Sequence, residues 1–220
     1  MLHRANMNCF SFESTCNNQS MSHPATIINA RIECSAKTIK ELGLNKEPLG
    51  YGNLEVDPLF CWYAHLFYLN RKKCLLFVNT LTRYPVLSVE LSRKEIQNFN
   101  AVLGESLKAQ LFDEGVSDEV IAKFLQHLYR PEISKSKNRS IIGTAVDYER
   151  LIRAYFEYPT DPRGPITQTQ MSLRLARTPI LSMRPDPFPY KVFSAQLQSR
   201  YGETGHFRFD SVAMRPSPPH

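Results

Sequence analysis

Three short apolar segments separated by polar turns constrain the fold of this chain more than any other feature. Residues 60–69, 74–79 and 84–89 are rich in aromatic and aliphatic side chains, and an Asn-Arg-Lys-Lys turn joins the first two. This spacing predicts three strands in an antiparallel meander. Alternate residues of a strand share a face, and the sets that begin at Trp62 and Tyr63 are both apolar. We therefore expect both faces of the sheet to be covered, one of them by helices.

Two amphipathic helices are predicted after the meander. Ser92 and Glu95 have the spacing of a capping box, and the apolar residues that follow recur at helical intervals up to Gly115. Ser117 begins a second helix with an acidic first turn, and Pro131 prevents further growth. The predicted fold class is α+β: an antiparallel β-meander packed against two amphipathic helices, with a further strand-to-helix unit.

Before the meander, residues 26–34 are expected to form a strand. Ser35 then caps a short helix that Gly43 ends, and 44–58 have loop composition.

The further strand-to-helix unit contains a cationic segment, residues 135–139. In a strand over 133–142, Lys135, Lys137 and Arg139 would share one face. The simplest structural interpretation is a solvated edge strand whose lysines prevent edge-to-edge pairing.

A helix is expected after the cationic segment. Gly143 would bend the chain and Asp147 would cap the helix. Backbone amides at a helix start attract anions, so the junction is a candidate anion site. The candidate anion-binding residues are Lys135, Lys137, Asn138, Arg139, Arg71, Lys72 and Arg174.

The charge of the chain agrees with an anionic partner without identifying one. The 27 Lys and Arg residues exceed the 21 Asp and Glu residues, for a net charge of +6. The excess lies in 130–177, which has nine cations and five acids, whereas 92–128 has four cations and six acids.

The sequence has neither an apolar run of about 18 residues nor the apolar core of a signal peptide, so we expect a soluble cytoplasmic protein with no membrane partner. The five cysteines lack CxxC spacing, which favours reduced thiols over a disulfide framework or a zinc site.

Signatures of common enzymes and cofactor sites are absent from the sequence, so no catalytic residue, metal or cofactor is predicted. His65 is interpreted as a core or cleft histidine with satisfied hydrogen bonds. Pairing of His65 with a nucleophilic Cys61 or Cys74 is a minor alternative. An enzyme of the metal-independent ribonuclease type, which can act through scattered polar side chains, also stays open.

The ends of the chain are predicted to differ from its centre. Residues 1–24 lack periodicity and are expected to be disordered, with the start left open between Met1 and Met21. Residues 25–180 are expected to form a single α+β domain that ends with a strand over 171–177. A Pro-rich, mostly irregular extension then covers 181–220, with a short helix over 190–198.

Several segments together are similar to a known family. They are LFCWYAHL at 59–66, NRKK at 70–73, LFVN at 76–79 and KSKNRS at 135–140. On these residues the chain resembles the bacterial family named domain of unknown function 6933. The likeness covers about 31–156, and SLRLARTP at 172–179 is similar to an extension of some relatives. The resemblance implies a small bacterial cytoplasmic α+β domain, and it implies no activity or ligand.

Two functions from different classes follow as hypotheses. The first is a non-catalytic module that binds nucleic acid or another phosphate-bearing partner through its Lys/Arg face. The second is a protein interaction module of a two-gene bacterial system, with Trp62 and Tyr63 as aromatic anchors. The sequence leaves the oligomeric state undefined.

Overall fold

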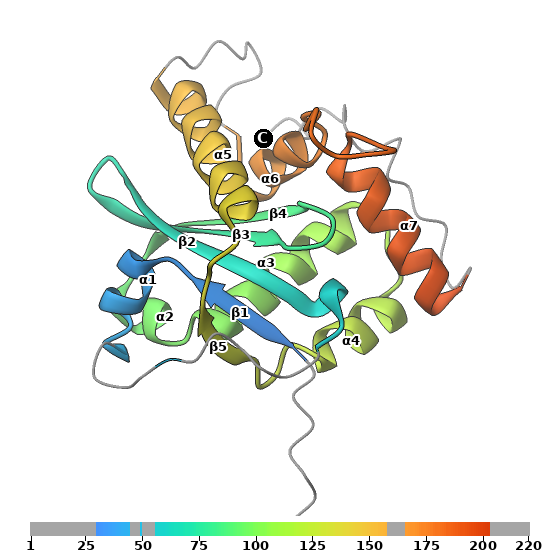
Figure 1. Ribbon diagram of the computed structural model, residues 1–220, viewed down its shortest axis with the longest axis horizontal. Helices are drawn as coiled ribbons and strands as arrows, with labels where there is room; N and C mark the ends of the chain where they lie inside the picture. The colour runs from blue at the N-terminus through green and yellow to red at the C-terminus, as the bar shows by residue number, and fades with distance from the viewer. Residues whose placement is uncertain (1–29, 45–48, 50–55, 158–165, 203–220) are drawn as a thin grey trace, which may run out of the picture.

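The computed structural model describes residues 30–44, 49, 56–157 and 166–202. The strands form one five-stranded sheet in the order β4-β3-β2-β1-β5 (Figure 1). They are β1 (Arg31–Cys34), β2 (Cys61–Leu69), β3 (Lys72–Asn79), β4 (Pro85–Leu91) and β5 (Glu132–Lys135). The helices are α1 (Ala36–Glu41), the single turn η2 (Pro58–Phe60), α2 (Arg93–Gln97), α3 (Phe99–Asp113), α4 (Asp118–Gln126), α5 (Arg139–Glu157), α6 (Gln168–Ala176) and α7 (Pro189–Tyr201). The fold belongs to the α+β class, as predicted.

The three predicted strands form a meander, since β2 pairs antiparallel with β3 and β3 with β4. Asn70 and Arg71 form the β2–β3 turn with φ angles of 47° and 65°, the left-handed pair that a two-residue hairpin needs. Phe67 lies opposite Cys74 in the register of this hairpin. Cys34, Cys61 and Cys74 are free thiols.

The rest of the sheet is parallel, a feature that the sequence did not reveal. β1 lies between β2 and β5 and runs in the same direction as both. It contains the end of the strand predicted over 26–34, whose first residues lie outside the described part of the chain. Ser35 caps α1 through a hydrogen bond from the Thr38 amide, and Gly43 follows with a φ of 72°.

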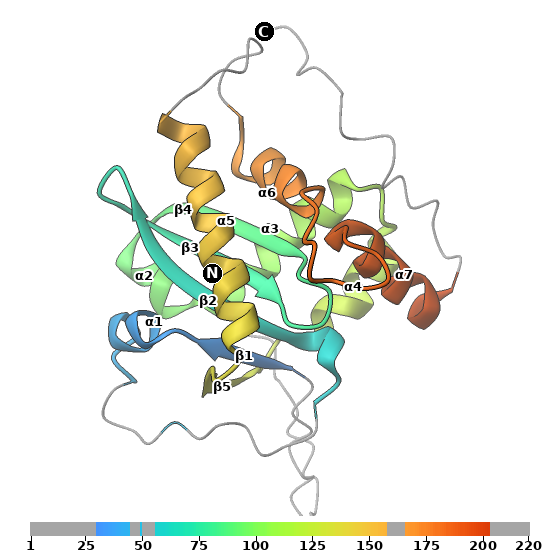
Figure 2. The same ribbon diagram turned by 45° about the horizontal axis from the view of Figure 1, so that its top comes forward.

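Helices cover both faces of the sheet (Figures 1 and 2). Residues of α3, α4 and α7 pack on one face, and residues of α5 and α6 pack on the other. The first cluster includes Trp62, Leu66, Phe77, Leu107, Phe124 and Phe193, and the second includes Tyr63, Phe67, Leu76, Ile141, Tyr148 and Met171. The two apolar faces that the alternation in 60–69 predicted are therefore both buried.

The helical region after the meander is confirmed with one change. The capping box is present, because the Ser92 amide donates to Glu95 Oε2 at 2.8 Å and the Glu95 amide donates to Ser92 Oγ at 3.3 Å. Asn98 interrupts the predicted helix at φ −115° and ψ 41°, which separates α2 from α3. Gly115, at φ 79°, follows the end of α3, and Ser117 caps α4.

The predicted strand over 133–142 is wrong. β5 ends at Lys135 and α5 begins at Arg139, so Gly143 and Asp147 lie inside the helix and neither bends nor caps the chain. The cause is Asn138, whose Oδ1 accepts hydrogen bonds from the amides of Ser140 at 3.1 Å and Ile141 at 3.2 Å. This cap starts the helix nine residues earlier than predicted, at Asn138 instead of Asp147.

The predicted strand over 171–177 is also wrong, because these residues belong to helix α6 and its C-cap. A second capping box, between Thr167 and Gln170, starts the helix. α6 lies along the edge strand β4, where Ser172 Oγ accepts from the Leu87 amide at 2.8 Å and Gln168 Oε1 accepts from the Val89 amide at 3.1 Å. These side chains supply the acceptors that a neighbouring strand would offer.

The helix predicted over 190–198 is present as α7, and it packs into the first cluster through Phe193 and Leu197. The Phe193 ring lies 4.3 Å from the Tyr84 ring, centroid to centroid. The predicted division at residue 180 stays a prediction. The predicted disordered segment 1–24 lies outside the described residues, as does the part of the predicted extension 181–220 that follows residue 202.

A buried ion pair joins α3 to the end of α6. The carboxylate of Glu114 is fully buried and accepts from Arg177 at 3.0 and 2.8 Å. The Tyr84 hydroxyl also donates to this carboxylate, at 3.3 Å. Burial raises the pKa of Glu114, although Arg177 opposes that effect. A buried charge needs such partners, so the pair fixes the position of α6.

Replacement of Phe193 tests whether α7 is part of the cooperative core. Phe193→Ala should lower the free energy of unfolding by about 3–5 kcal/mol, because it leaves a cavity among Trp62, Tyr84 and Phe124. Phe112→Ala is the matched control, since Phe112 is 65% exposed and its loss should change stability by less than about 0.5 kcal/mol. Equal effects in urea denaturation would show that α7 is not part of the core.

Candidate functional site

A cavity of about 560 Å³ lies where β1 and β5 end. Its polar wall comes from Lys135, Ser136 and Lys137 in the β5–α5 connection, and from Cys34 and Ser35 after β1. Cys34 pairs with Lys135 in the register of the two strands, so both strands leave the sheet at the same level. Parallel strands that diverge at their carboxyl ends form the crevice that ligands commonly occupy in open sheets. The volume is within the usual range for small-molecule sites.

The rest of the cavity lining is largely apolar. Ala36 and Ile39 of α1 contribute to it, together with Leu44 just beyond that helix and Ile142 of α5. Tyr63 of β2 completes the lining. The cavity therefore combines two lysines with an aliphatic and aromatic surface.

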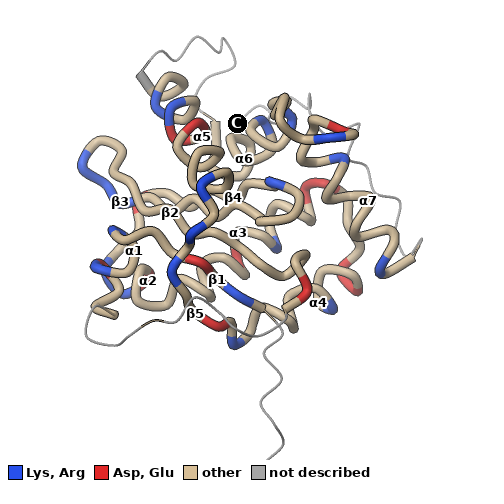
Figure 3. Tube along the Cα trace, viewed as in Figure 1, with Lys and Arg blue, Asp and Glu red and all other residues tan. Residues whose placement is uncertain are grey.

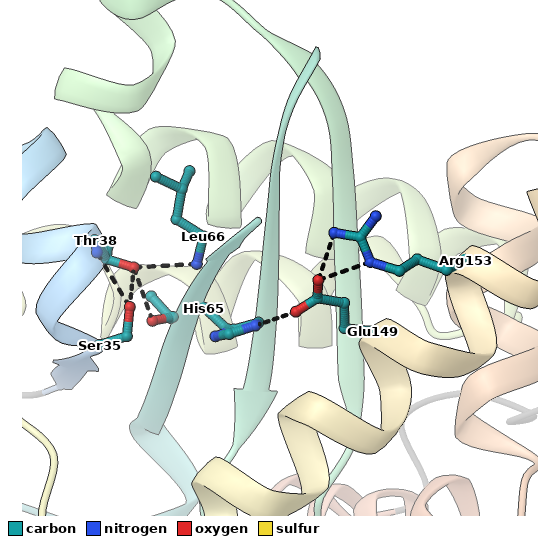
Figure 4. A network of polar contacts seen from close by, with 7 residues as sticks. Ser35, Thr38, His65, Leu66, Glu149 and Arg153 are labelled. Carbon is teal, nitrogen blue, oxygen red and sulfur yellow. Dashed lines mark hydrogen bonds and ion pairs between the residues drawn. The ribbon is translucent and has the colours of Figure 1, made fainter. Parts of the chain in front are cut away.

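A buried threonine fixes α1 beside the cavity. The amide of Leu66 donates to Thr38 Oγ1 at 3.1 Å, and this hydroxyl lies 3.3 Å from the Ala64 carbonyl and 2.8 Å from Ser35 Oγ (Figure 4). Thr38 is fully buried. Its side chain continues the pairing of β2 beyond the point where β1 stops, so the first turn of α1 is held at the sheet edge.

The β5–α5 connection is held by a chain of short hydrogen bonds. The Ser136 hydroxyl donates to Glu33 Oε2 at 2.6 Å, and the Asn138 amide donates to Ser136 Oγ at 3.3 Å. Because the side chain of Asn138 accepts from the first turn of α5, two amides there are already satisfied. Anion binding at this junction must therefore rely on the lysine side chains more than on the helix start.

The three described thiols, of which only Cys34 lines the cavity, are poor nucleophiles. Burial raises the pKa of Cys34 to about 12 and the pKa of Cys61 to about 11, and it also raises the pKa of Cys74. A thiol must ionise to attack, so these values disfavour the cysteine nucleophile that the sequence left open. Burial likewise raises the pKa of Tyr63 to about 12.

The structure brings only part of the predicted anion site together. Lys135 and Lys137 line one cavity, whereas Arg139 lines a separate cavity of about 390 Å³ on the other side of the first turn of α5. Figure 3 shows the Lys/Arg positions of the β5–α5 connection apart from those at the tip of the β2–β3 hairpin, where Arg71 and Lys72 are exposed.

Arg174 also lies away from the cationic segment. It packs over the Tyr155 ring at 4.8 Å from the centroid and donates to the Tyr155 hydroxyl. Tyr155 is 16 residues beyond Arg139 on α5, which corresponds to about 24 Å of helix.

The two predicted interaction anchors do not reach the surface. Trp62 is fully buried and Tyr63 is 1% exposed, because helices cover both faces of β2. This burial removes both side chains from any surface that a partner protein would contact.

A second polar group lies on the α5 side of β2. His65 Nε2 is 2.7 Å from Glu149 Oε2, and Arg153 donates to Glu149 Oε1 at 2.9 and 2.6 Å (Figure 4). The interpretation of His65 as a bonded histidine holds for Nε2, whereas its buried Nδ1 finds no partner among the described residues. The sequence offered a weak signal for Glu149 and Arg153, which are four residues apart on a helix, and none for their contact with His65.

Neither His65 nor His127 lines the cavity at the ends of β1 and β5. In the described ranges, no group of three or more His, Cys, Asp and Glu residues could hold a metal ion. The same ranges contain no helix with the length and apolar character needed to cross a membrane.

Comparison with known proteins gives one match. A model of the family described as a domain of unknown function (DUF6933) matches residues 31–190. This match confirms the resemblance found in the sequence and continues past 156 through the segment 172–179. No curated protein and no solved structure matches the chain.

The His65–Glu149–Arg153 group predicts a pH-dependent contribution to stability. Burial acts to raise the pKa of Glu149, but hydrogen bonds from His65 and Arg153 outweigh it and hold the pKa below its ordinary value. A carboxylate with a depressed pKa stabilises the fold above its unfolded pKa and loses that effect as the pH falls. Glu149→Gln should therefore lower the free energy of unfolding at pH 7 by about 1–2 kcal/mol. The difference from wild type should shrink below about pH 4.5.

Urea denaturation across a pH series measures this difference. Asp147→Asn is the control, because Asp147 lies on the same helix but is 70% exposed in its pair with Arg150. A Glu149→Gln effect that stays constant from neutral to acid pH would contradict the assigned ion pair.

Proposed function

The chain belongs to the family described as a domain of unknown function (DUF6933), and we propose that it is a non-catalytic module that binds a phosphate-bearing ligand at the ends of β1 and β5. The cavity between α1 and α5 receives the ligand, and its two lysines neutralise the phosphate. The chain works in a reducing cytoplasm, which the free thiols of Cys34, Cys61 and Cys74 support.

One observation carries this proposal: Lys135 and Lys137 are exposed side chains on the wall of the same cavity. An ammonium group donates strong, charge-assisted hydrogen bonds to phosphate oxygens. The ordered connection from Glu33 through Ser136 to Asn138 holds the backbone between the two lysines, which favours a defined binding geometry.

The positions of the cations favour a compact ligand over a long nucleic acid. A protein that binds a nucleic-acid backbone neutralises several successive phosphates, which requires a continuous cationic track. Here Arg71 and Lys72 lie at a hairpin tip and Arg174 lies against Tyr155, away from the two lysines of the cavity. A ligand with one or two adjacent phosphates matches the observed cluster better.

The other functions considered from the sequence have less support. A ribonuclease-like reaction needs groups that transfer protons, and neither described histidine contacts the cavity. A protein interface centred on Trp62 and Tyr63 has less support, because both side chains are buried in the core.

Paired substitutions test the proposal. The Lys135→Ala/Lys137→Ala double variant should bind inorganic pyrophosphate at least tenfold more weakly than wild type, since each charged hydrogen bond contributes about 1.5–3 kcal/mol. Arg71→Ala/Lys72→Ala is the matched control, because it removes two exposed cations at the hairpin tip and should leave the affinity nearly unchanged. Isothermal titration calorimetry at low salt provides both values.

An equal loss in both double variants would mean that net charge alone governs binding, which would overturn the cavity as the site. Absence of pyrophosphate binding to wild type would overturn the proposed function. If a single-stranded RNA oligomer bound instead, with an affinity that depended on Arg71 and Lys72, the nucleic-acid function would replace it.

A further inference from the structure

Phosphate alone does not account for the composition of the cavity. Its volume of about 560 Å³ is much larger than a phosphate group requires, and half of its wall consists of side chains that cannot bind phosphate. Leu44 and Ile142 are only partly buried, so they present apolar surface to the cavity. Apolar walls with a few placed polar groups are typical of sites for small organic ligands.

The hydroxyl of Tyr63 is the second unexplained feature. Tyr63 lines the cavity, no hydrogen bond joins its hydroxyl to the described residues, and its oxygen is not among the fully enclosed polar atoms that lack a partner. The hydroxyl is therefore accessible from the cavity. A phenol hydroxyl that faces a cavity without a protein partner can donate a hydrogen bond to a ligand there. A tyrosine is protonated near neutral pH at its ordinary pKa, and burial raises the pKa of Tyr63 further, to about 12, so the hydroxyl is a hydrogen-bond donor.

We infer that the cavity takes a nucleoside monophosphate, with its phosphate at Lys135 and Lys137 and its base between the apolar wall and Tyr63. This inference rests on the proposed function and specifies the ligand class. A nucleobase has flat faces that pack against aliphatic side chains such as Ile39 and Ile142, and edge atoms that accept a hydrogen bond from a phenol.

Other phosphorylated molecules match the same walls less well. A sugar phosphate would place hydroxyl groups against Leu44 and Ile142, where they lose hydrogen bonds to water without replacement. An alkyl phosphate would pack against these side chains but would leave the Tyr63 hydroxyl unbonded. A nucleobase satisfies both the apolar wall and the phenol.

The test compares ligands that share a phosphate and differ in the attached group. Calorimetric titration of the full-length chain with the four common nucleoside monophosphates, ribose 5-phosphate and pyrophosphate gives the affinities. At least one nucleoside monophosphate should bind tenfold or more tightly than ribose 5-phosphate. Equal affinities would overturn the inference and leave the lysine site intact, whereas no binding of any ligand, pyrophosphate included, would overturn the proposed function itself.

Two variants separate the base contacts from the phosphate contacts. Tyr63→Phe removes only the unbonded hydroxyl, so it should keep the melting temperature and weaken nucleotide binding about fivefold or more. Leu44→Ala shortens the apolar wall and should also weaken nucleotide binding. Both variants should bind pyrophosphate like wild type.

Tyr68→Phe is the matched control for the phenol, because the Tyr68 hydroxyl donates to Glu41 outside the cavity lining. It should bind nucleotides and pyrophosphate like wild type. Nucleotide affinities that do not change in either Tyr63→Phe or Leu44→Ala would overturn the assigned orientation of the base.

Discussion

β1 is hydrogen-bonded on both sides to strands that run in its own direction, β2 on one side and β5 on the other. Its last residue, Cys34, lies beside Lys135, the last residue of β5, so the chain leaves the sheet at the same level in both places. One exit leads into α1 and the other into α5, and the two paths separate. The cavity between them therefore exists because the strands are parallel and their ends diverge. The side chains that line it determine which ligands it can bind.

Side chains complete the hydrogen bonding of the sheet where strands are missing. Thr38 takes the place of a strand beside Leu66, and α6 does the same for β4 through Ser172 and Gln168. Backbone groups buried without partners would destabilise the fold, so these helices must keep their positions. The Arg177–Glu114 pair adds a second restraint on α6, because neither charge can be buried alone without a large penalty.

The parts of this fold that could be predicted depend on contacts close in sequence. The β2–β3 hairpin follows from its turn residues, and the capping box at Ser92 needs only a residue three positions away. The parallel pairing of β1 depends on distant partners. The start of α6 did have a local signal, the Thr167–Gln170 capping box, but the alternation in 171–177 led to the prediction of a strand. Within the site, Lys135 and Lys137 were recognised from local spacing, whereas the position of Tyr63 in the cavity lining depends on residues of β1, α1 and α5 that are distant in sequence.

The two edges of the sheet differ in one respect that matters for self-association. Side chains of α6 accept hydrogen bonds from the Leu87 and Val89 amides of β4, whereas in the described part of the chain no strand pairs with the outer side of β5. A sheet with a single open edge can accept one more sheet and then has no free edge left. Strand-to-strand growth through the described edges would therefore stop at two copies instead of continuing into a fibre, and the exposed charge of Lys135 opposes even that first step.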